Sequence, residues 1–243
     1  MNRASALTAL VAVPVLVGSG LTGVGAAVAA PSCADYTFIG VAGSGEGAEA
    51  GGMGTLVSNV VSDLAQRARA KGKTVATRAV RYPALPVPQT VETVGPFLQS
   101  METGARNTQG DIGIVARGCP STKIVVVGYS QGAAAAHRAL QRTANGKQIA
   151  AAALIADPDR RPGDTARSGG SASGGQGLAR AVPIGGALPQ ALPVPIGAHT
   201  LSWCNAGDGI CDWTGSMDDA KSSVHTSYTA APIAAGLAPL AGL

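Results

Sequence analysis

The clearest candidate for chemistry is the segment Gly128-Tyr129-Ser130-Gln131-Gly132, which fits the pattern G-x-S-x-G. By itself the pattern is weak, because a chain with 34 glycines yields about a third of a match by chance. Its context is more specific: an apolar, β-branched run precedes it and a run of alanines typical of a helix start follows. A strand, a sharp turn and a helix in this order present a nucleophilic serine beside the positive end of the helix. The sequence therefore predicts Ser130 as an exposed nucleophile.

A serine hydroxyl needs a base to take its proton, and the chain offers three histidines. His137 lies two turns further along the same predicted helix, so we expect it at the surface and away from the hydroxyl. His199 falls within a predicted strand, where packing is the commoner role. His225 is the last histidine and follows a loop, in the Ser, Asp, His order of α/β-hydrolases. His225 is therefore the predicted base.

The carboxylate that orients this base is predicted to be Asp208, in the loop between Cys204 and Cys211. A disulfide across that loop would hold the carboxylate in place. Asp157, at the end of a predicted strand, and Asp212, just after the loop, are the alternatives. A plain turn role for Asp208 also remains open, because it stands between two glycines.

An oxyanion hole needs two hydrogen-bond donors. The backbone N–H of Gln131, directly after the nucleophile, is the first. The second is predicted at Ser44, in the glycine-rich loop 43–47 after the first strand, although a flexible turn fits that spacing equally well. This loop lacks the lysine and the glycine spacing of phosphate-binding loops, which argues against a nucleotide site.

Short apolar runs and amphipathic segments alternate along the chain and must position these residues. Strands are predicted at 36–41, 74–80, 123–127, 149–155 and 198–204, and helices at 55–70, 90–106, 111–117 and 131–142. This alternation predicts an α/β fold with a parallel sheet covered on both faces. The Gly/Ser/Pro-rich segment 163–196 breaks the pattern, and we expect an irregular loop that acts as a mobile flap near the mouth of the site.

The first 29 residues have the pattern of a signal peptide: Arg3 is the one charge, an apolar run follows, and the segment ends on Ala27-Val28-Ala29. Cleavage after Ala29 would leave a secreted protein whose single domain spans 30–243. A retained membrane anchor is the alternative, although Pro14 and several glycines dilute the apolar run.

The amino-acid composition further limits the class of protein and the kinds of partner that we expect. The chain has 243 residues, of which 46% are hydrophobic and 13% charged, which excludes a wholly disordered chain. Aromatic residues make up 3%, and the basic residues behind the net charge of +4 are scattered, so we expect no nucleic-acid partner. The four cysteines allow three disulfide pairings. A zinc site is disfavoured because Cys33 and Cys119 lack a C-x-x-C partner.

Taken together, several motifs resemble the cutinase family of secreted serine esterases from Cys33 onward. They are Cys119-Pro120, the segment from Lys123 to Ala133, Cys204-Asn205-x-Gly207-Asp208-x-x-Cys211, and His225-x-x-Tyr228. The resemblance implies a three-layer α/β/α hydrolase with a central five-stranded parallel sheet. It also implies a triad of Ser130, Asp208 and His225, an oxyanion hole of Ser44 and Gln131, and disulfides Cys33–Cys119 and Cys204–Cys211.

The sequence thus predicts a secreted carboxylic-ester hydrolase that acts on apolar acyl esters, such as a cutin-like polyester, a short-chain lipid or a phospholipid. Acyl transfer to an alcohol and deacetylation of a polysaccharide are alternatives on the same triad, and a non-catalytic lipid-binding protein is an alternative of another class. We expect a monomer that makes peripheral contact with lipid, and no cofactor or metal.

Overall fold

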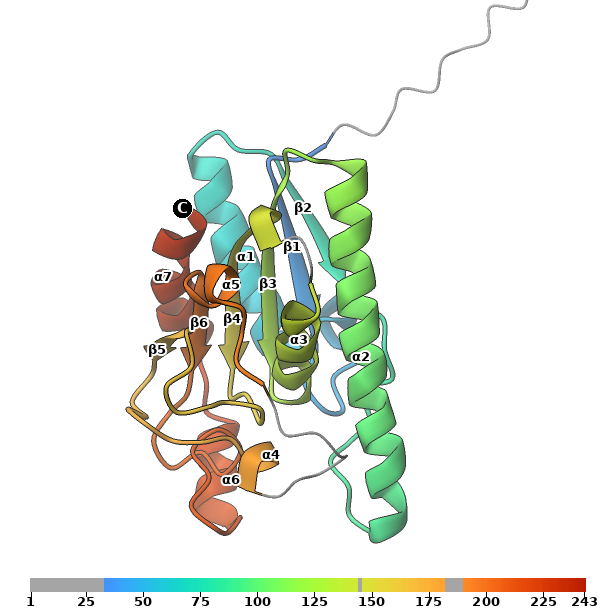
Figure 1. The fold of residues 1–243 in the computed structure, drawn as a ribbon, viewed down its shortest axis with the longest axis vertical. Helices are drawn as coiled ribbons and strands as arrows, with labels where there is room; N and C mark the ends of the chain where they lie inside the picture. Colours follow the sequence, from blue (N-terminus) through green and yellow to red (C-terminus); the bar gives the residue numbers. More distant parts are fainter. Residues whose placement is uncertain (1–32, 144–145, 182–189) are drawn as a thin grey trace, which may run out of the picture. The chain divides into compact units, whose positions relative to one another are not determined.

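A parallel sheet of six strands forms the middle layer of the computed structural model, which describes residues 33–143, 146–181 and 190–243 (Figure 1). The strand order is β2-β1-β3-β4-β6-β5. The strands are β1 (Tyr36–Val41), β2 (Val75–Ala79), β3 (Lys123–Tyr129), β4 (Ile149–Ile155), β5 (Arg167–Gly169) and β6 (Thr200–Trp203). All neighbouring strands pair in parallel. Their carboxyl ends therefore meet at one edge of the sheet, the lower edge in Figure 1.

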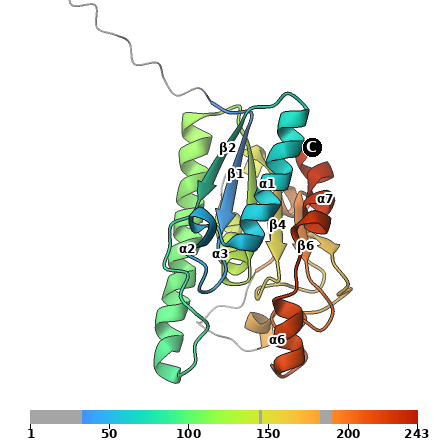
Figure 2. The same cartoon turned by 180° about the vertical axis from the view of Figure 1, so that it is seen from behind.

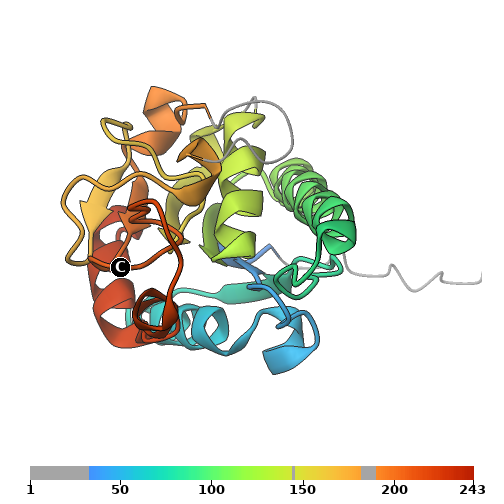
Figure 3. The same cartoon turned by 90° about the horizontal axis from the view of Figure 1, so that it is seen from below.

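Two pairs of helices cover the two faces of the sheet (Figures 2 and 3). One face packs against α1 (Thr55–Ala70) and α7 (Ala230–Ala241), and the other against α2 (Val91–Gly118) and α3 (Gln131–Gln141). Phe38 lies in the first of these cores and its neighbour Ile39 in the second, because successive side chains of a strand point to opposite faces. Burial on both faces explains why the strands are near-continuous apolar runs.

The described residues also form shorter helices. They are η1 (Glu49–Gly52), η2 (Gly146–Gln148), α4 (Leu178–Ala181), α5 (Val194–Gly197) and α6 (Asp219–His225). The predicted three-layer α/β/α fold is confirmed, with one correction to the strand count. A sixth strand, β5, lies in the segment predicted to be irregular and pairs with β6 through Arg167 to Gly169. It was missed because an edge strand of three residues has no apolar run.

Outside β5, the segment 163–196 is also more ordered by hydrogen bonds than predicted. Beyond β5, the Ala172 N–H donates to the Cys204 carbonyl, and the guanidinium of Arg160 donates to the carbonyls of Ala172 and Gly175. This Gly/Ser stretch is therefore fixed to the body of the protein, rather than being a free linker. Residues 182–189 of the segment lie outside the described residues.

The two helices predicted at 90–106 and 111–117 are one helix, α2, of 28 residues. Thr108 and Ile112 on its inner face are buried against the body of the protein. Packing along this face outweighs the low helix propensity of the polar and glycine residues between the two predicted segments.

Both disulfides implied by the resemblance are present, Cys33–Cys119 and Cys204–Cys211. Within the described ranges, no helix combines the length and the apolar character that crossing a membrane requires. The predicted signal peptide, 1–29, lies outside the described residues.

Candidate active site

Ser130 occupies a sharp turn between β3 and α3, with φ of 53° and ψ of −120°. Two glycines make this turn possible. A Cβ at Gly128 would lie 2.5 Å from the carbonyl oxygen of Gly132, and a Cβ at Gly132 would lie 2.2 Å from that of Ala42. Contrary to the expectation of an exposed serine, Ser130 is only 7% exposed, because it lines a groove that other side chains enclose.

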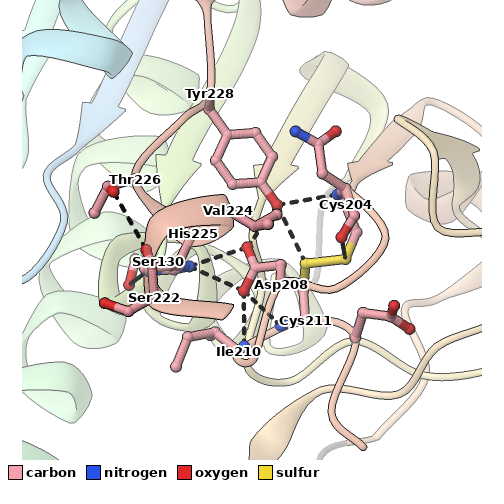
Figure 4. A network of polar contacts seen from close by, with 12 residues as sticks. Ser130, Cys204, Asp208, Ile210, Cys211, Ser222, Val224, His225, Thr226 and Tyr228 are labelled. Atoms are coloured by element: carbon pink, nitrogen blue, oxygen red, sulfur yellow. Dashed lines mark hydrogen bonds and ion pairs between the residues drawn. A yellow bond between two sulfur atoms is a disulfide. The ribbon is translucent and has the colours of Figure 1, made fainter. Parts of the chain in front are cut away.

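The structure brings Ser130, His225 and Asp208 into hydrogen-bond contact at the carboxyl edge of the sheet (Figure 4). Nε2 of His225 lies 3.0 Å from the Ser130 Oγ, and Nδ1 lies 3.1 and 3.0 Å from the two carboxylate oxygens of Asp208. These contacts fit a histidine that is protonated on Nδ1, donates to Asp208 and accepts the serine proton on Nε2. The arrangement can activate a hydroxyl for attack on a carbonyl.

Asp208 is held as an ionised acceptor. Burial of the carboxyl opposes its ionisation, but hydrogen bonds from His225, Tyr228 and the backbone N–H of Ile210 more than offset this, so the pKa of Asp208 lies below its ordinary value. The Ile210 N–H lies 2.7 Å from Oδ1. The disulfide of Cys204 with Cys211 closes the loop that carries Asp208.

The alternative carboxylates and histidines have other partners. Asp212 accepts a hydrogen bond from the Gly207 N–H at 2.9 Å. Asp157 lies 2.6 Å from Nδ1 of His137, and both side chains are buried. The prediction that His137 is a surface residue is therefore wrong, since Asp157 and the Gln190 carbonyl contact its two ring nitrogens. His199 is exposed just before β6 instead of packing within the strand.

The His137 imidazole is charged in this pair. Burial alone would lower its pKa, but the Asp157 carboxylate outweighs this and raises the pKa of His137 to about 9. His137 thus belongs to a buried ion pair that is separate from the Ser130 site.

Tyr228 is a residue at the site to which the sequence analysis gave no role. Its hydroxyl donates to Oδ2 of Asp208 at 2.6 Å and accepts from the Asn205 N–H at 3.1 Å. Tyr129 supports the histidine in turn: its ring stacks on His225 with centroids 5.3 Å apart, and its hydroxyl donates to the His225 carbonyl at 2.7 Å. The spacing His225-x-x-Tyr228 was the available signal, but it gave no indication of which atom the tyrosine contacts.

We expect Tyr228→Phe to lower kcat for ester hydrolysis about tenfold with little change in KM, because Asp208 loses one hydrogen bond that stabilises its charge while the groove is unaltered. Steady-state kinetics on a p-nitrophenyl ester measure both constants. The matched control is Tyr36→Phe, which removes a hydrogen bond to the Ala241 carbonyl far from the site and should leave kcat unchanged. Equal kcat in the two variants would contradict a positioning role for Tyr228.

Ser44 lines the same groove as Ser130, and its buried Oγ has no hydrogen-bond partner among the described residues. The loop that carries it is fixed rather than flexible. The Glu46 carboxylate accepts from the Gly43 N–H at 2.9 Å, and the Tyr82 hydroxyl donates to the Ala42 carbonyl. Burial raises the pKa of Glu46 above its ordinary value. A buried hydroxyl with no partner is available to donate to a substrate oxygen.

The groove has a volume of about 480 Å³. Gln131 lines it beside Ser130, and most of the other lining residues are apolar side chains of α2, α4 and the loops around them. Among the described residues, no group of three His, Cys, Asp or Glu side chains converges to hold a metal ion.

The three-layer fold, with a serine at the turn after β3 and a histidine and an aspartate that follow later strands, is that of an α/β-hydrolase. The family model for cutinase matches residues 32–237. The chain belongs to the cutinase family and is an ester hydrolase, as the resemblance implied.

Two related proteins come from Mycobacterium tuberculosis. Phospholipase Culp4 is 29% identical over 195 residues, which cover 75% of this chain and 69% of that protein. Carboxylesterase Culp1 is 28% identical over 206 residues, or 84% of this chain and 78% of that protein. The chain spans about half the length of the fungal cutinases that it matches. A cutinase-like protein from Cryptococcus sp. shares the fold, with a TM-score of 0.60, 23% identity, and coverage of 85% of this chain and 91% of that one.

Proposed function

We propose that the protein is a secreted serine hydrolase of apolar acyl esters and that Ser130, His225 and Asp208 are its catalytic triad. The observation that carries the proposal is the continuous set of contacts from the Ser130 hydroxyl through His225 to the Asp208 carboxylate. Secretion rests on the signal-like pattern of residues 1–29 and fits the two disulfides, which persist in oxidising compartments.

Acylation begins when the Ser130 Oγ attacks the ester carbonyl carbon and its proton passes to Nε2 of His225. The carbonyl oxygen takes up the electron pair as an oxyanion, which accepts hydrogen bonds from the Gln131 N–H and from Ser44. The tetrahedral intermediate then collapses, the bond to the alkoxy oxygen breaks, and the leaving alcohol takes the proton from Nε2. Asp208 stabilises the transient imidazolium without becoming protonated.

Deacylation repeats these steps with water as the nucleophile. His225 takes a proton from the water, the hydroxide oxygen attacks the acyl carbon, and the Ser130 Oγ leaves with the proton from Nε2. The carboxylic acid is released and the serine is restored. An alcohol in place of the water would give acyl transfer instead of hydrolysis.

The mostly apolar groove supports an apolar acyl group as the part of the substrate bound beside Ser130. The names of the mycobacterial relatives, a phospholipase and a carboxylesterase, agree with lipid or other carboxylic esters as the substrate class. Exposed Val87 and Met217 at the walls of the groove support peripheral contact with lipid. We propose a monomer with no nucleic-acid partner.

Labelling with a fluorophosphonate tests the proposal, because this probe reacts with an activated serine hydroxyl. We expect one label per chain on Ser130, located by peptide mass spectrometry, together with hydrolysis of p-nitrophenyl esters that the label abolishes. A lipid-binding protein without turnover would take up lipid, remain unlabelled and release no p-nitrophenol, and that result would overturn the proposal. Analysis of the products with and without an acceptor alcohol separates hydrolysis from acyl transfer.

A further inference from the structure

Ser130 and two residues of α3, Gln131 and Arg138, line the groove. One wall is α2 and the loop before it, with Phe97 and Met101 among its apolar side chains. The other wall includes Leu178, whose N–H donates to the Ile210 carbonyl at 2.8 Å. Helix geometry sets the spacing of two of these residues: Arg138 is the eighth residue after Ser130, or about 12 Å further along the helix axis. Since helical side chains lean towards the N-terminus, we expect the guanidinium to lie somewhat nearer to the serine than this.

Arg138 lines a groove whose other lining residues are mostly apolar. Its Nε and Nη2 donate to the carboxylate of Asp159 at 2.6 and 3.0 Å, and Asp159 is fully buried. Within the described part of the chain, the third nitrogen, Nη1, has no hydrogen-bond partner. The guanidinium therefore retains donors that can serve a bound molecule, while Asp159 fixes its plane and compensates its charge.

The unpaired N–H donors of Arg138 determine which kind of acyl chain binds favourably in this part of the groove. A plain alkyl chain that covers Arg138 removes water from its N–H groups and offers them no acceptor, which is unfavourable. A chain with an oxygen at the same depth accepts a hydrogen bond from a charged donor. A neutral oxygen suffices, because the Asp159 carboxylate already compensates the positive charge. The charged pair thus discriminates between chains of equal length by the position of an oxygen.

We propose that Arg138 is a specificity-determining residue that donates a hydrogen bond to an oxygen within the acyl chain of the substrate. The helix geometry sets this oxygen roughly at positions 6 to 10 of the acyl chain, with the scissile carbonyl carbon counted as position 1. The inference rests on the proposed function, in that the acyl group attached to Ser130 extends along α3. The substrate class is a carboxylic ester whose apolar acyl chain is interrupted by an ether, hydroxyl or ester oxygen.

Isomeric substrates test the inference on the wild-type protein. We would prepare p-nitrophenyl esters of a twelve-atom acyl chain in which one ether oxygen replaces the methylene at each position from 5 to 11. These esters have the same composition, so differences in kcat/KM report position alone. We expect a maximum within the window of positions 6 to 10, about tenfold above the lowest positions. Values of kcat/KM that do not depend on position would overturn the inference.

A pair of double variants assigns the preference to Arg138. Arg138→Met with Asp159→Asn removes the donor without leaving a buried carboxylate unpaired, and we expect the maximum to disappear. The matched control is Arg142→Met with Glu102→Gln, which removes an ion pair at the C-terminal end of α3, outside the groove, and should keep the maximum. Persistence of the maximum in the Arg138 variant would overturn the assignment. If this variant does not fold, as judged by circular dichroism, the positional series on the wild-type protein decides.

The experiments distinguish failure of this inference from failure of the proposed function. Loss of the positional maximum, with fluorophosphonate labelling and hydrolysis still dependent on Ser130, rejects the role of Arg138 alone. Hydrolysis that does not depend on Ser130 rejects the proposed triad, whatever the positional series shows.

Discussion

Ser130→Ala is expected to lower kcat for p-nitrophenyl butyrate by about 10⁴- to 10⁶-fold while the protein keeps its fold and its melting temperature. The loss is large because, in the proposed mechanism, the hydroxyl forms the covalent intermediate and the members of the triad act as one unit. The fold is retained because the alanine occupies the same turn and the neighbouring glycines are unchanged. Steady-state kinetics at high enzyme concentration, with circular dichroism on the same sample, measure both quantities.

Fluorophosphonate labelling provides the control for the Ser130 variant. The wild-type protein should be labelled and the variant should not, which also detects contamination by a host esterase. Turnover of the folded variant at the wild-type rate, with no label elsewhere, would remove Ser130 from the mechanism.

Asp208→Asn is expected to lower kcat by about 10⁴-fold with a smaller change in KM. An asparagine can place an N–H towards Nδ1 of His225, which favours the tautomer that is protonated on Nε2. This tautomer cannot accept the serine proton. The effect should appear in kcat because Asp208 is buried behind the histidine and does not line the groove.

Asp212→Asn is the matched control for Asp208, since it lies just outside the same disulfide loop. Its amide oxygen can still accept the Gly207 N–H, so we expect activity within a few-fold of wild type. Comparable losses in the two variants would indicate that the loop needs both carboxylates for its structure and would contradict a specific role for Asp208.

Much of the fold could be predicted because its strands are buried on both faces. Such strands are continuous apolar runs, and their alternation with amphipathic segments permits few topologies. The turn at Ser130 could be predicted for a related reason. Close packing there admits only glycine at 128 and 132, so the constraint is visible in the residue types themselves.

The features that the sequence did not reveal depend on contacts between distant segments. β5 is a strand only because its backbone pairs with β6, and its residues have no strand pattern of their own. His137 was placed at the surface because the pattern of its helix does not show that a later segment covers it. The role of Tyr228 depends on the position of one hydroxyl, which no sequence spacing specifies.

The backbone conformation at Ser130 also carries an energetic cost. A residue with a side chain rarely adopts φ of 53° with ψ of −120°, and such a conformation costs of order 1–3 kcal/mol. Glycine would relieve most of this strain, so selection for thermodynamic stability alone would favour glycine at this position as well as at Gly128 and Gly132. A serine at this position therefore gives up some stability for the hydroxyl that the proposed mechanism requires.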